Sequence, residues 1–319
     1  MKTGGESWHN RSMTSPEPSR EILIHPGFHK TGTTFLQECV FSDERYFRSL
    51  LDHGDVDRLL LRPHDLEFDE ALPREEIARR MDPVPNSLVP VLSSETLSGN
   101  ILTGARDSRT LARRLHSVFP SAKILFTVRN QPALMKSAYL QYAKRGGRLK
   151  PSQFFDFNAE PGYDRFDIGV LSFDRLVDEY ASLFGRENIL VLPQELLRQD
   201  QGKFLSLLFE FAGVAGSPPE GGYEGSRGKS PPEAGLALLR AANLFDSTPF
   251  QPRPAIALPS LGRGLRSLSY RLEGRSDSKS GNLGQIVREK CSNRFANSNR
   301  NLQKYCPIDL TPLGYDVSS

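Results

Sequence analysis

The 319-residue sequence is poor in cysteine and tryptophan, and it has no apolar run near the ~20 residues that a membrane-spanning helix needs. Its three cysteines, Cys39, Cys291 and Cys306, are odd in number and lack the spacing of metal ligands, so we expect a reduced, cytoplasmic protein. Residues 1–20 lack the apolar core of a signal peptide. These absences leave at most a peripheral contact with a membrane.

The net positive charge is also small for a nucleic-acid-binding protein. The net charge is only +3, and no dense stripe of Lys and Arg is interleaved with aromatic residues. Such a balance suits a local anion site better than a long basic surface, so no nucleic-acid partner is expected. The pattern does not indicate an oligomeric state.

Apolar strand patterns and amphipathic helix patterns alternate along the chain, which predicts an α/β fold with a doubly wound, mostly parallel sheet flanked by helices. We expect one domain over residues 21–319, preceded by a disordered tail over 1–20, with a mobile insertion near 250–285. Short helices and loops are expected over 42–87. The predicted strands are 22–24, 88–93, 123–128 and 188–192, and the main predicted helices are 108–118, 132–145, 168–184 and 201–212.

The most informative stretch is residues 22–41, ILIHPGFHKTGTTFLQECVF. An apolar strand meets a turn with Gly27 and then a small-residue loop from Lys30 to Thr34, after which an apolar-periodic helix begins. Backbone N–H groups of such a loop and the N-terminus of the helix favour an anion at one point. Lys30 adds a mobile positive charge. The stretch therefore predicts a site for a phosphorylated ligand.

This loop departs from the phosphate-binding loop of NTPases, G-x-x-x-x-G-K-[ST]. Gly27 and Gly32 have the required separation, but Thr33 stands where that motif has its lysine, and Lys30 lies upstream. The loop thus lacks the lysine that reaches the β- and γ-phosphates. A phosphorylated ligand other than a nucleoside triphosphate is favoured.

A second stretch, KILFTVRNQPALMKSAYLQYAKRGG over residues 123–147, repeats the strand-then-helix pattern. Arg129 lies at the carboxyl end of its strand, where open α/β sheets bind ligands. Ser137 follows on the next helix, about two turns from Arg129. A guanidinium fork and a hydroxyl at these places can converge on one phosphate.

Together the two stretches resemble the sulfotransferases that use 3′-phosphoadenosine 5′-phosphosulfate (PAPS). They resemble the bacterial and carbohydrate-type members of that family more than the animal cytosolic members. The resemblance implies a P-loop-like fold, PAPS as sulfuryl donor without a metal, and an acceptor hydroxyl on a small molecule, glycan or glycolipid. It implies that the first loop binds the 5′ end of PAPS and that the strand-end arginine and the helix serine bind the 3′-phosphate. A later loop carries Arg227, although the family's usual Arg-Lys-Gly order is absent there. The implied cofactor-binding residues are Lys30, Thr31, Gly32, Thr33, Thr34, Arg129, Ser137 and Arg227.

Sulfuryl transfer needs a base for the acceptor hydroxyl and a cation for the leaving oxygen. Glu95 follows a predicted strand within LVPVLSSETLSG, at a position where the resembling family carries its base. His29 is the rival base, because it adjoins Lys30 in the loop. Lys30 is the candidate for the leaving oxygen, whereas His25 is expected to be structural.

Two alternatives come from other classes of protein. A nucleotide kinase or NTPase is disfavoured by the missing lysine after Gly32 and by the lack of a strand-end Asp for Mg²⁺. A non-catalytic nucleotide-binding protein is disfavoured by the presence of Glu95. Activity measurements separate these alternatives from a sulfotransferase.

Overall fold

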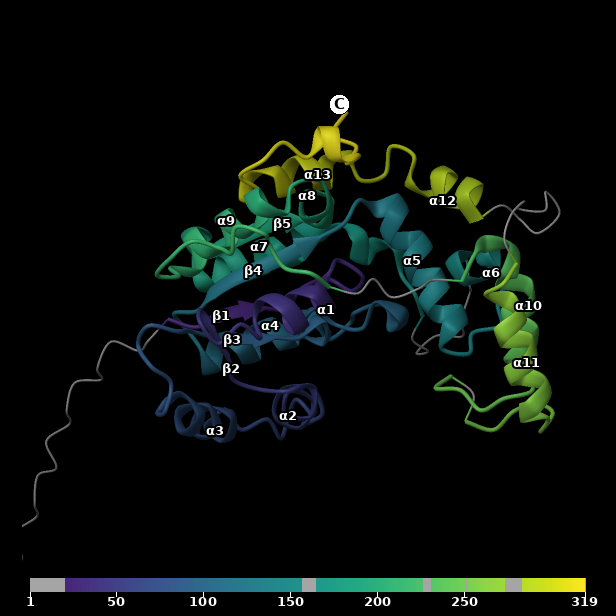
Figure 1. Cartoon of the computed structure of the whole chain (residues 1–319), viewed down its shortest axis with the longest axis horizontal. Helices are drawn as coiled ribbons and strands as arrows, with labels where there is room; N and C mark the ends of the chain where they lie inside the picture. Colours follow the sequence, from purple (N-terminus) through teal and green to yellow (C-terminus); the bar gives the residue numbers. More distant parts are fainter. Residues whose placement is uncertain (1–20, 157–164, 226–230, 251, 273–282, 319) are drawn as a thin grey trace, which may run out of the picture.

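The computed structural model describes residues 21–318, apart from 157–164, 226–230, 251 and 273–282. Five strands of the described residues form one all-parallel sheet in the order β2-β3-β1-β4-β5, with helices on both faces (Figure 1). This confirms the predicted α/β fold class. The strands are β1 (Leu23–His25), β2 (Phe47–Ser49), β3 (Val89–Ser93), β4 (Lys123–Val128) and β5 (Ile189–Pro193).

Each face of the sheet packs on its own apolar core, because successive side chains of a strand point to opposite faces. Along β4, Ile124 and Phe126 belong to the core that includes α4 and α7, whereas Leu125 belongs to the core that includes α9. The helices are α1 (Thr33–Phe35), α2 (His53–Val56), α3 (Ala71–Met81), α4 (Ser108–Val118), α5 (Gln131–Lys144), α6 (Pro151–Asp156), α7 (Phe173–Phe184), α8 (Gln194–Gln199), α9 (Gln201–Ala212), α10 (Leu236–Ala242), α11 (Pro259–Ser269), α12 (Leu283–Cys291) and α13 (Ala296–Leu302).

The predicted elements recur with small shifts at their ends. The helix expected over 168–184 is divided into a 3₁₀ turn, η5 (Ile168–Leu171), and α7, and the first helix continues from α1 as a π-helical turn, η1 (Leu36–Val40). Strand β2 lies within 42–87, where we expected only short helices and loops. No described helix combines the length and apolarity needed to cross a membrane.

Parts of the domain prediction fall outside the described residues. These are the tail over 1–20 and, within the expected insertion, residue 251 and the stretch 273–282. The remaining part of the insertion contains the ordered helix α11. The single domain and the mobile insertion therefore stay predictions.

The sheet order creates one edge where several loops diverge. Strand β1 lies between β3 and β4, with Leu23 paired to Val91 on one side and to Lys123 on the other. The connection after β1 runs toward β2 on one side of the sheet, whereas the connection after β4 runs toward β5 on the other side. These two loops therefore diverge and leave a crevice at the carboxyl ends of β1 and β4. The two predicted motifs and Glu95 all begin at this edge.

A buried hydrogen-bond network joins the strands just below that edge. His25 Nδ1 lies 2.8 Å from Ser93 Oγ, and His25 Nε2 lies 3.0 Å from Thr127 Oγ1. Thr127 Oγ1 is also 2.7 Å from Thr31 Oγ1 in the loop after β1. His25 is fully buried. It therefore has a structural place, linking β1 to both of its neighbours.

Burial of His25 makes stability depend on pH. Its pKa is lowered from 6.5 to about 3 in the folded chain by loss of solvation. Below pH 6.5 the unfolded chain takes up a proton at this residue that the folded chain does not, so stability falls as the pH falls toward 3, by at most about 1.4 kcal/mol per pH unit. Urea unfolding of the wild type and of His25→Asn at several pH values should show a shallower loss in the variant. The exposed His64 gives the control His64→Asn, and equal slopes for wild type and His25→Asn would contradict the prediction.

Candidate functional site

The loop after β1 has an unusual backbone conformation that neighbouring side chains hold in place. Lys30 has φ +66°, a left-handed value that is uncommon for residues other than glycine, and Gly32 has φ +99°. The Lys30 carbonyl accepts a hydrogen bond from Arg129 Nη1 at 3.3 Å. Gln194, in the amide orientation that satisfies both of its groups, donates to the same carbonyl at 3.3 Å and accepts from Gly32 N–H at 3.2 Å. The loop is therefore fixed against β4 and α8 before any ligand binds.

The threonines of this loop point in different directions. Thr31 is fully buried, and its hydroxyl donates to the Phe28 carbonyl, so only its backbone N–H is left for a ligand. Thr33 Oγ1 is also buried but has no hydrogen-bond partner among the described residues. Thr34 is exposed. Because α1 begins at Thr33, the first N–H groups of this turn have no partner within the helix.

Positive charges surround Lys30. Burial lowers the pKa of its ammonium group, and the charges of Lys144, Arg129 and Arg145 add to the shift, while Glu95 opposes it. Cations held together in this way repel one another unless an anion lies among them. The electrostatics at the loop therefore favour binding of a multiply charged anion.

Arg129, just after β4, adds a second positive charge at the same edge of the sheet. Burial lowers its pKa, and the charge of Arg198 has the same effect, whereas Glu195 and Tyr315 oppose it. The guanidinium has five N–H donors, and its contact with the Lys30 carbonyl uses one of them. Ser137 is half-buried on α5, which begins two residues after Arg129. The structure thus brings Lys30 and Arg129 into direct contact, as expected if both bind one ligand.

Glu95 and His29 lie next to the same loop. Glu95 opens the 3₁₀ turn η3 (Glu95–Ser98) after β3, and its Oε2 is buried without a hydrogen-bond partner among the described residues. His29 Nε2 lies 3.1 Å from the Gly99 carbonyl, which can only accept, so Nε2 carries a proton. Burial lowers the pKa of His29 against the opposing charge of Glu95. Neutral His29 therefore has its lone pair on Nδ1, and either residue is chemically able to take a proton.

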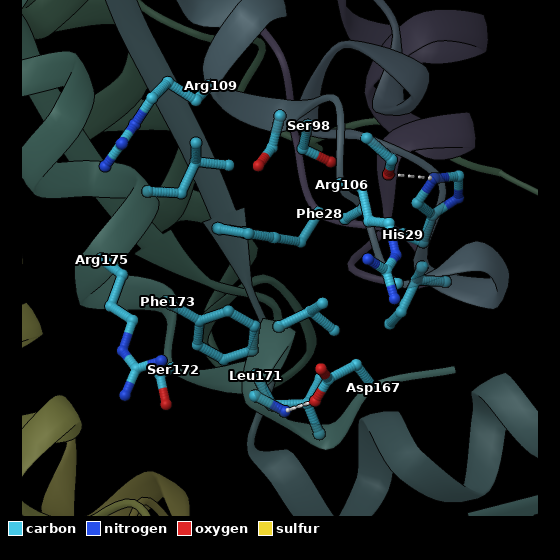
Figure 2. A pocket seen from close by; sticks show the side chains of 18 of the residues that line it. Phe28, His29, Ser98, Arg106, Arg109, Asp167, Leu171, Ser172, Phe173 and Arg175 are labelled. Carbon is cyan, nitrogen blue, oxygen red and sulfur yellow. Dashed lines mark hydrogen bonds between the residues drawn. The ribbon is translucent and has the colours of Figure 1, made fainter. Parts of the chain in front are cut away.

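A cavity of about 460 Å³ opens beside His29 (Figure 2). It lies between the segment after β3, the start of α7 and α5. Figure 2 shows Arg109 and Arg175 at the side of the cavity away from His29, and Arg109 forms an ion pair with Glu179 at 3.1 Å. Apolar side chains make much of its lining, namely Phe28, Ile101, Leu134, Val170, Leu171, Phe173 and Leu176.

Several residues of the site were not predicted from the sequence. Lys144 and Arg145 come from the far end of α5, and Gln194 and Arg198 come from α8. Their positions follow from tertiary packing, and no local motif marks them. Arg227, predicted to contact the nucleotide, lies outside the described residues.

The chain has a fold similar to that of three solved sulfotransferase structures. No protein-family model matches it, and a search of curated proteins finds no match. The sulfotransferase from Alicyclobacillus acidocaldarius is 21% identical, with a TM-score of 0.40, covering 63% of this chain and 85% of that chain. The sulfotransferase domain from the curacin biosynthetic pathway is 15% identical, with a TM-score of 0.41, covering 86% of this chain and 98% of that one. The sulfotransferase domain from the Synechococcus PCC 7002 olefin synthase is 14% identical, with a TM-score of 0.37, covering 89% of this chain and 98% of that one. At these identities and TM-scores the similarity by itself assigns no activity.

Proposed function

We propose that this protein transfers a sulfuryl group from PAPS to an acceptor hydroxyl. The observation that carries the proposal is the meeting of three groups at one sheet edge. The Arg129 guanidinium contacts the Lys30 carbonyl, and the charge of Glu95 acts on Lys30. Two polar atoms that are buried without partners among the described residues, Thr33 Oγ1 and Glu95 Oε2, lie in the segments that form this edge. A ligand with phosphate oxygens and a reacting hydroxyl would satisfy both.

The donor end of the site consists of the loop after β1. Lys30, the hydroxyls of Thr33 and Thr34, and the backbone N–H groups from Thr31 onward are the donors proposed for the 5′-phosphosulfate. Glycine at position 32 permits the backbone φ of +99° in this loop, and a Cβ there would meet Leu197 of α8 at 3.3 Å. These groups provide both charge and hydrogen bonds to the sulfuryl-bearing end.

The 3′-phosphate is assigned to the edge of β4. Arg129 offers the remaining N–H groups of its planar fork, which match a phosphate better than a point charge does. Ser137 on α5 adds a hydroxyl donor in this proposal, and Arg227 adds a further cation. The field of Arg198 strengthens the same region.

PAPS supplies the sulfuryl group, and the chain supplies the proton acceptor and the countercharge. As the acceptor oxygen forms a bond to sulfur, the bond between sulfur and the bridging oxygen breaks, which gives a sulfate ester and 3′,5′-adenosine diphosphate. Glu95 takes the hydroxyl proton, and Lys30 stabilises the negative charge that grows on the bridging oxygen. His29 stays the rival for the proton.

The cavity beside His29 is the proposed acceptor site. Its apolar lining, with Phe28, Leu171 and Phe173 among its side chains, suits a hydroxyl carried on a partly apolar molecule. This favours a glycolipid over a bare glycan as the acceptor. An acceptor bound in this cavity would lie between His29 and the arginines at the far side.

The two alternative functions receive less support. A kinase or NTPase of the P-loop type needs a lysine at position 33, and the chain has a threonine there whose side chain is buried. A purely binding protein has no use for a carboxylate oxygen buried without a partner, as at Glu95 Oε2. We therefore retain sulfuryl transfer.

Binding of 3′,5′-adenosine diphosphate tests the proposal by titration calorimetry. We expect Arg129→Ala to weaken binding by about 3 kcal/mol, roughly a hundredfold, because a charged hydrogen-bond donor to the phosphate is lost. The affinity of Arg129→Lys should lie between that of the wild type and that of Arg129→Ala, because a lysine keeps the positive charge but lacks the planar guanidinium fork. Arg62→Ala removes an arginine whose side chain is 79% exposed, and it should bind like the wild type. Absence of binding by the wild type, or equal binding by the wild type and Arg129→Ala, would defeat the assignment.

A further inference from the structure

One end of the molecule exposes most of the large apolar side chains found on the described surface. Helices α10 and α11 lie at this end, away from the sheet (Figure 1). Six of the eight large hydrophobic residues that are exposed in the described chain fall within residues 250–272. They are Phe250, Ile256, Leu258, Leu261, Leu268 and Leu272, with exposed fractions between 38% and 52%. Scattered exposed apolar residues need no explanation, but a cluster of this kind marks an interaction surface.

Helix α11 turns its leucines outward because it packs through small residues. Gly262 and Ser269 are buried, and a Cβ added to Gly262 would meet the Asp246 side chain at 3.0 Å. Leu261, Leu265 and Leu268 are spaced by four and three residues, so they share one face of the helix, which is not the face that Gly262 and Ser269 occupy. The helix thus presents a stripe of leucines in which Leu261 and Leu268 are 46% and 49% exposed and Leu265 is half-buried.

Positive charge gathers at the same end. Residues 247–272 contain four arginines and no Asp or Glu, and residues 131–155 contain five Lys or Arg and no Asp or Glu. The two stretches touch, since the Phe250 N–H donates to the Arg145 carbonyl at 3.3 Å and the Phe250 ring lies 5.5 Å from that of Tyr142. We call residues 142–150 together with 247–272 the basic apolar end. The second stretch is flanked in the sequence by two acids, Asp246 and Glu273. Asp246 lies 4.0 Å from Arg266.

We propose that the basic apolar end docks the protein on a membrane surface that contains anionic lipids. Leucine and phenylalanine side chains enter the boundary between headgroups and acyl chains, while arginines meet the lipid phosphates. Self-association through the same surface is disfavoured, because two copies would bring arginines against arginines. The inference does not depend on sulfuryl transfer. It does bring α5, which carries Ser137 and ends at Lys144, close to the membrane, where a lipid-borne acceptor would be met.

Sedimentation of the full chain with vesicles measures this docking. The vesicles are of phosphatidylcholine alone or of phosphatidylcholine with phosphatidylglycerol, and we expect binding to the second kind that weakens as salt is raised. Leu261→Ser/Leu268→Ser should weaken the partition coefficient by roughly tenfold or more, since inserted apolar area is lost. Leu66→Ser/Leu72→Ser is the matched control and should bind like the wild type, because these are the two exposed leucines of the described residues that lie outside the basic apolar end.

The charge component is tested separately. Arg263→Gln/Arg271→Gln should weaken binding to the anionic vesicles by roughly fivefold for each arginine that lies near the lipid surface, while Arg62→Gln/Arg79→Gln should leave it unchanged. Both control arginines have exposed side chains outside the basic apolar end. Binding of 3′,5′-adenosine diphosphate is measured in parallel, so that a folding defect or a failure of the proposed function is seen independently.

Three results would overturn the proposal. One is equal sedimentation with zwitterionic and anionic vesicles, and another is unchanged binding by Leu261→Ser/Leu268→Ser. The third is a concentration-dependent dimer in lipid-free solution that this leucine variant abolishes, which would make a second copy the occupant of the stripe. Docking on an acidic protein instead of lipid would give the first of these results, with no sedimentation on either kind of vesicle.

Discussion

Replacing Glu95 with glutamine is expected to lower turnover by roughly a hundredfold to ten-thousandfold, the range over which a positioned general base contributes. The amide has nearly the shape of the carboxylate, but it cannot accept the acceptor's proton. Affinity for 3′,5′-adenosine diphosphate should stay nearly unchanged, because the phosphate ligands are elsewhere. The rate is measured as transfer of radiolabelled sulfuryl from PAPS to an acceptor found by screening lipid and glycan fractions.

His29 provides the sharpest control for this experiment. Its pKa is lowered by burial, so the ring is neutral at pH 7, and its Nε2 proton is directed to the Gly99 carbonyl. The Nδ1 lone pair could therefore serve as the base in place of Glu95. We expect Glu95→Ala to be partly rescued by formate, and His29→Ala to gain nothing from imidazole. Full turnover in Glu95→Gln together with imidazole rescue of His29→Ala would assign the proton to His29.

Much of the fold was predictable because parallel strands buried on both faces have continuous apolar sequences. The runs 123–128 and 188–192 are of this kind and became β4 and β5. Strand β2 escaped prediction because it has only three residues, FRS, of which Phe47 alone is buried. Its place at the edge of the sheet comes from pairing with β3, which local sequence does not encode.

The candidate site was predictable where a motif fixes the backbone and not where tertiary packing decides. Lys30 and Arg129 lie in contact because parallel strands bring their carboxyl ends to one edge. The inward turn of the Thr31 hydroxyl depends on Thr127 across the sheet, so the loop sequence alone could not show it. Helix α11 was not predicted because its sequence is rich in glycine, proline and serine, although two of these residues, Gly262 and Ser269, are the ones that it buries.

Replacing Lys30 with alanine should impair both the transfer to the acceptor and the slow hydrolysis of PAPS that needs no acceptor. The reason is that both reactions expel the same bridging oxygen, and removal of a preorganised donor at a developing charge costs roughly a hundredfold to a thousandfold in rate. Glu95→Gln should reduce transfer to the acceptor with a smaller effect on hydrolysis. The two variants thus separate stabilisation of the leaving oxygen from deprotonation of the acceptor. The measurement is the release of 3′,5′-adenosine diphosphate with and without acceptor.

The lowered pKa of Lys30 gives this prediction a second measurement that does not depend on turnover. Burial and the cations around it favour loss of its proton as the pH rises, whereas a bound phosphate favours the charged form and raises the pKa again. Binding of 3′,5′-adenosine diphosphate at alkaline pH should therefore be accompanied by proton uptake, and affinity should fall as the pH rises further. Calorimetry in buffers of different ionisation enthalpy detects that uptake, and Lys30→Ala should abolish it. Lys30→Arg is the matched control, because an arginine keeps its charge throughout this range and should bind without taking up a proton. Proton uptake that persists unchanged in Lys30→Ala would show that a group other than Lys30 takes up the proton when the ligand binds.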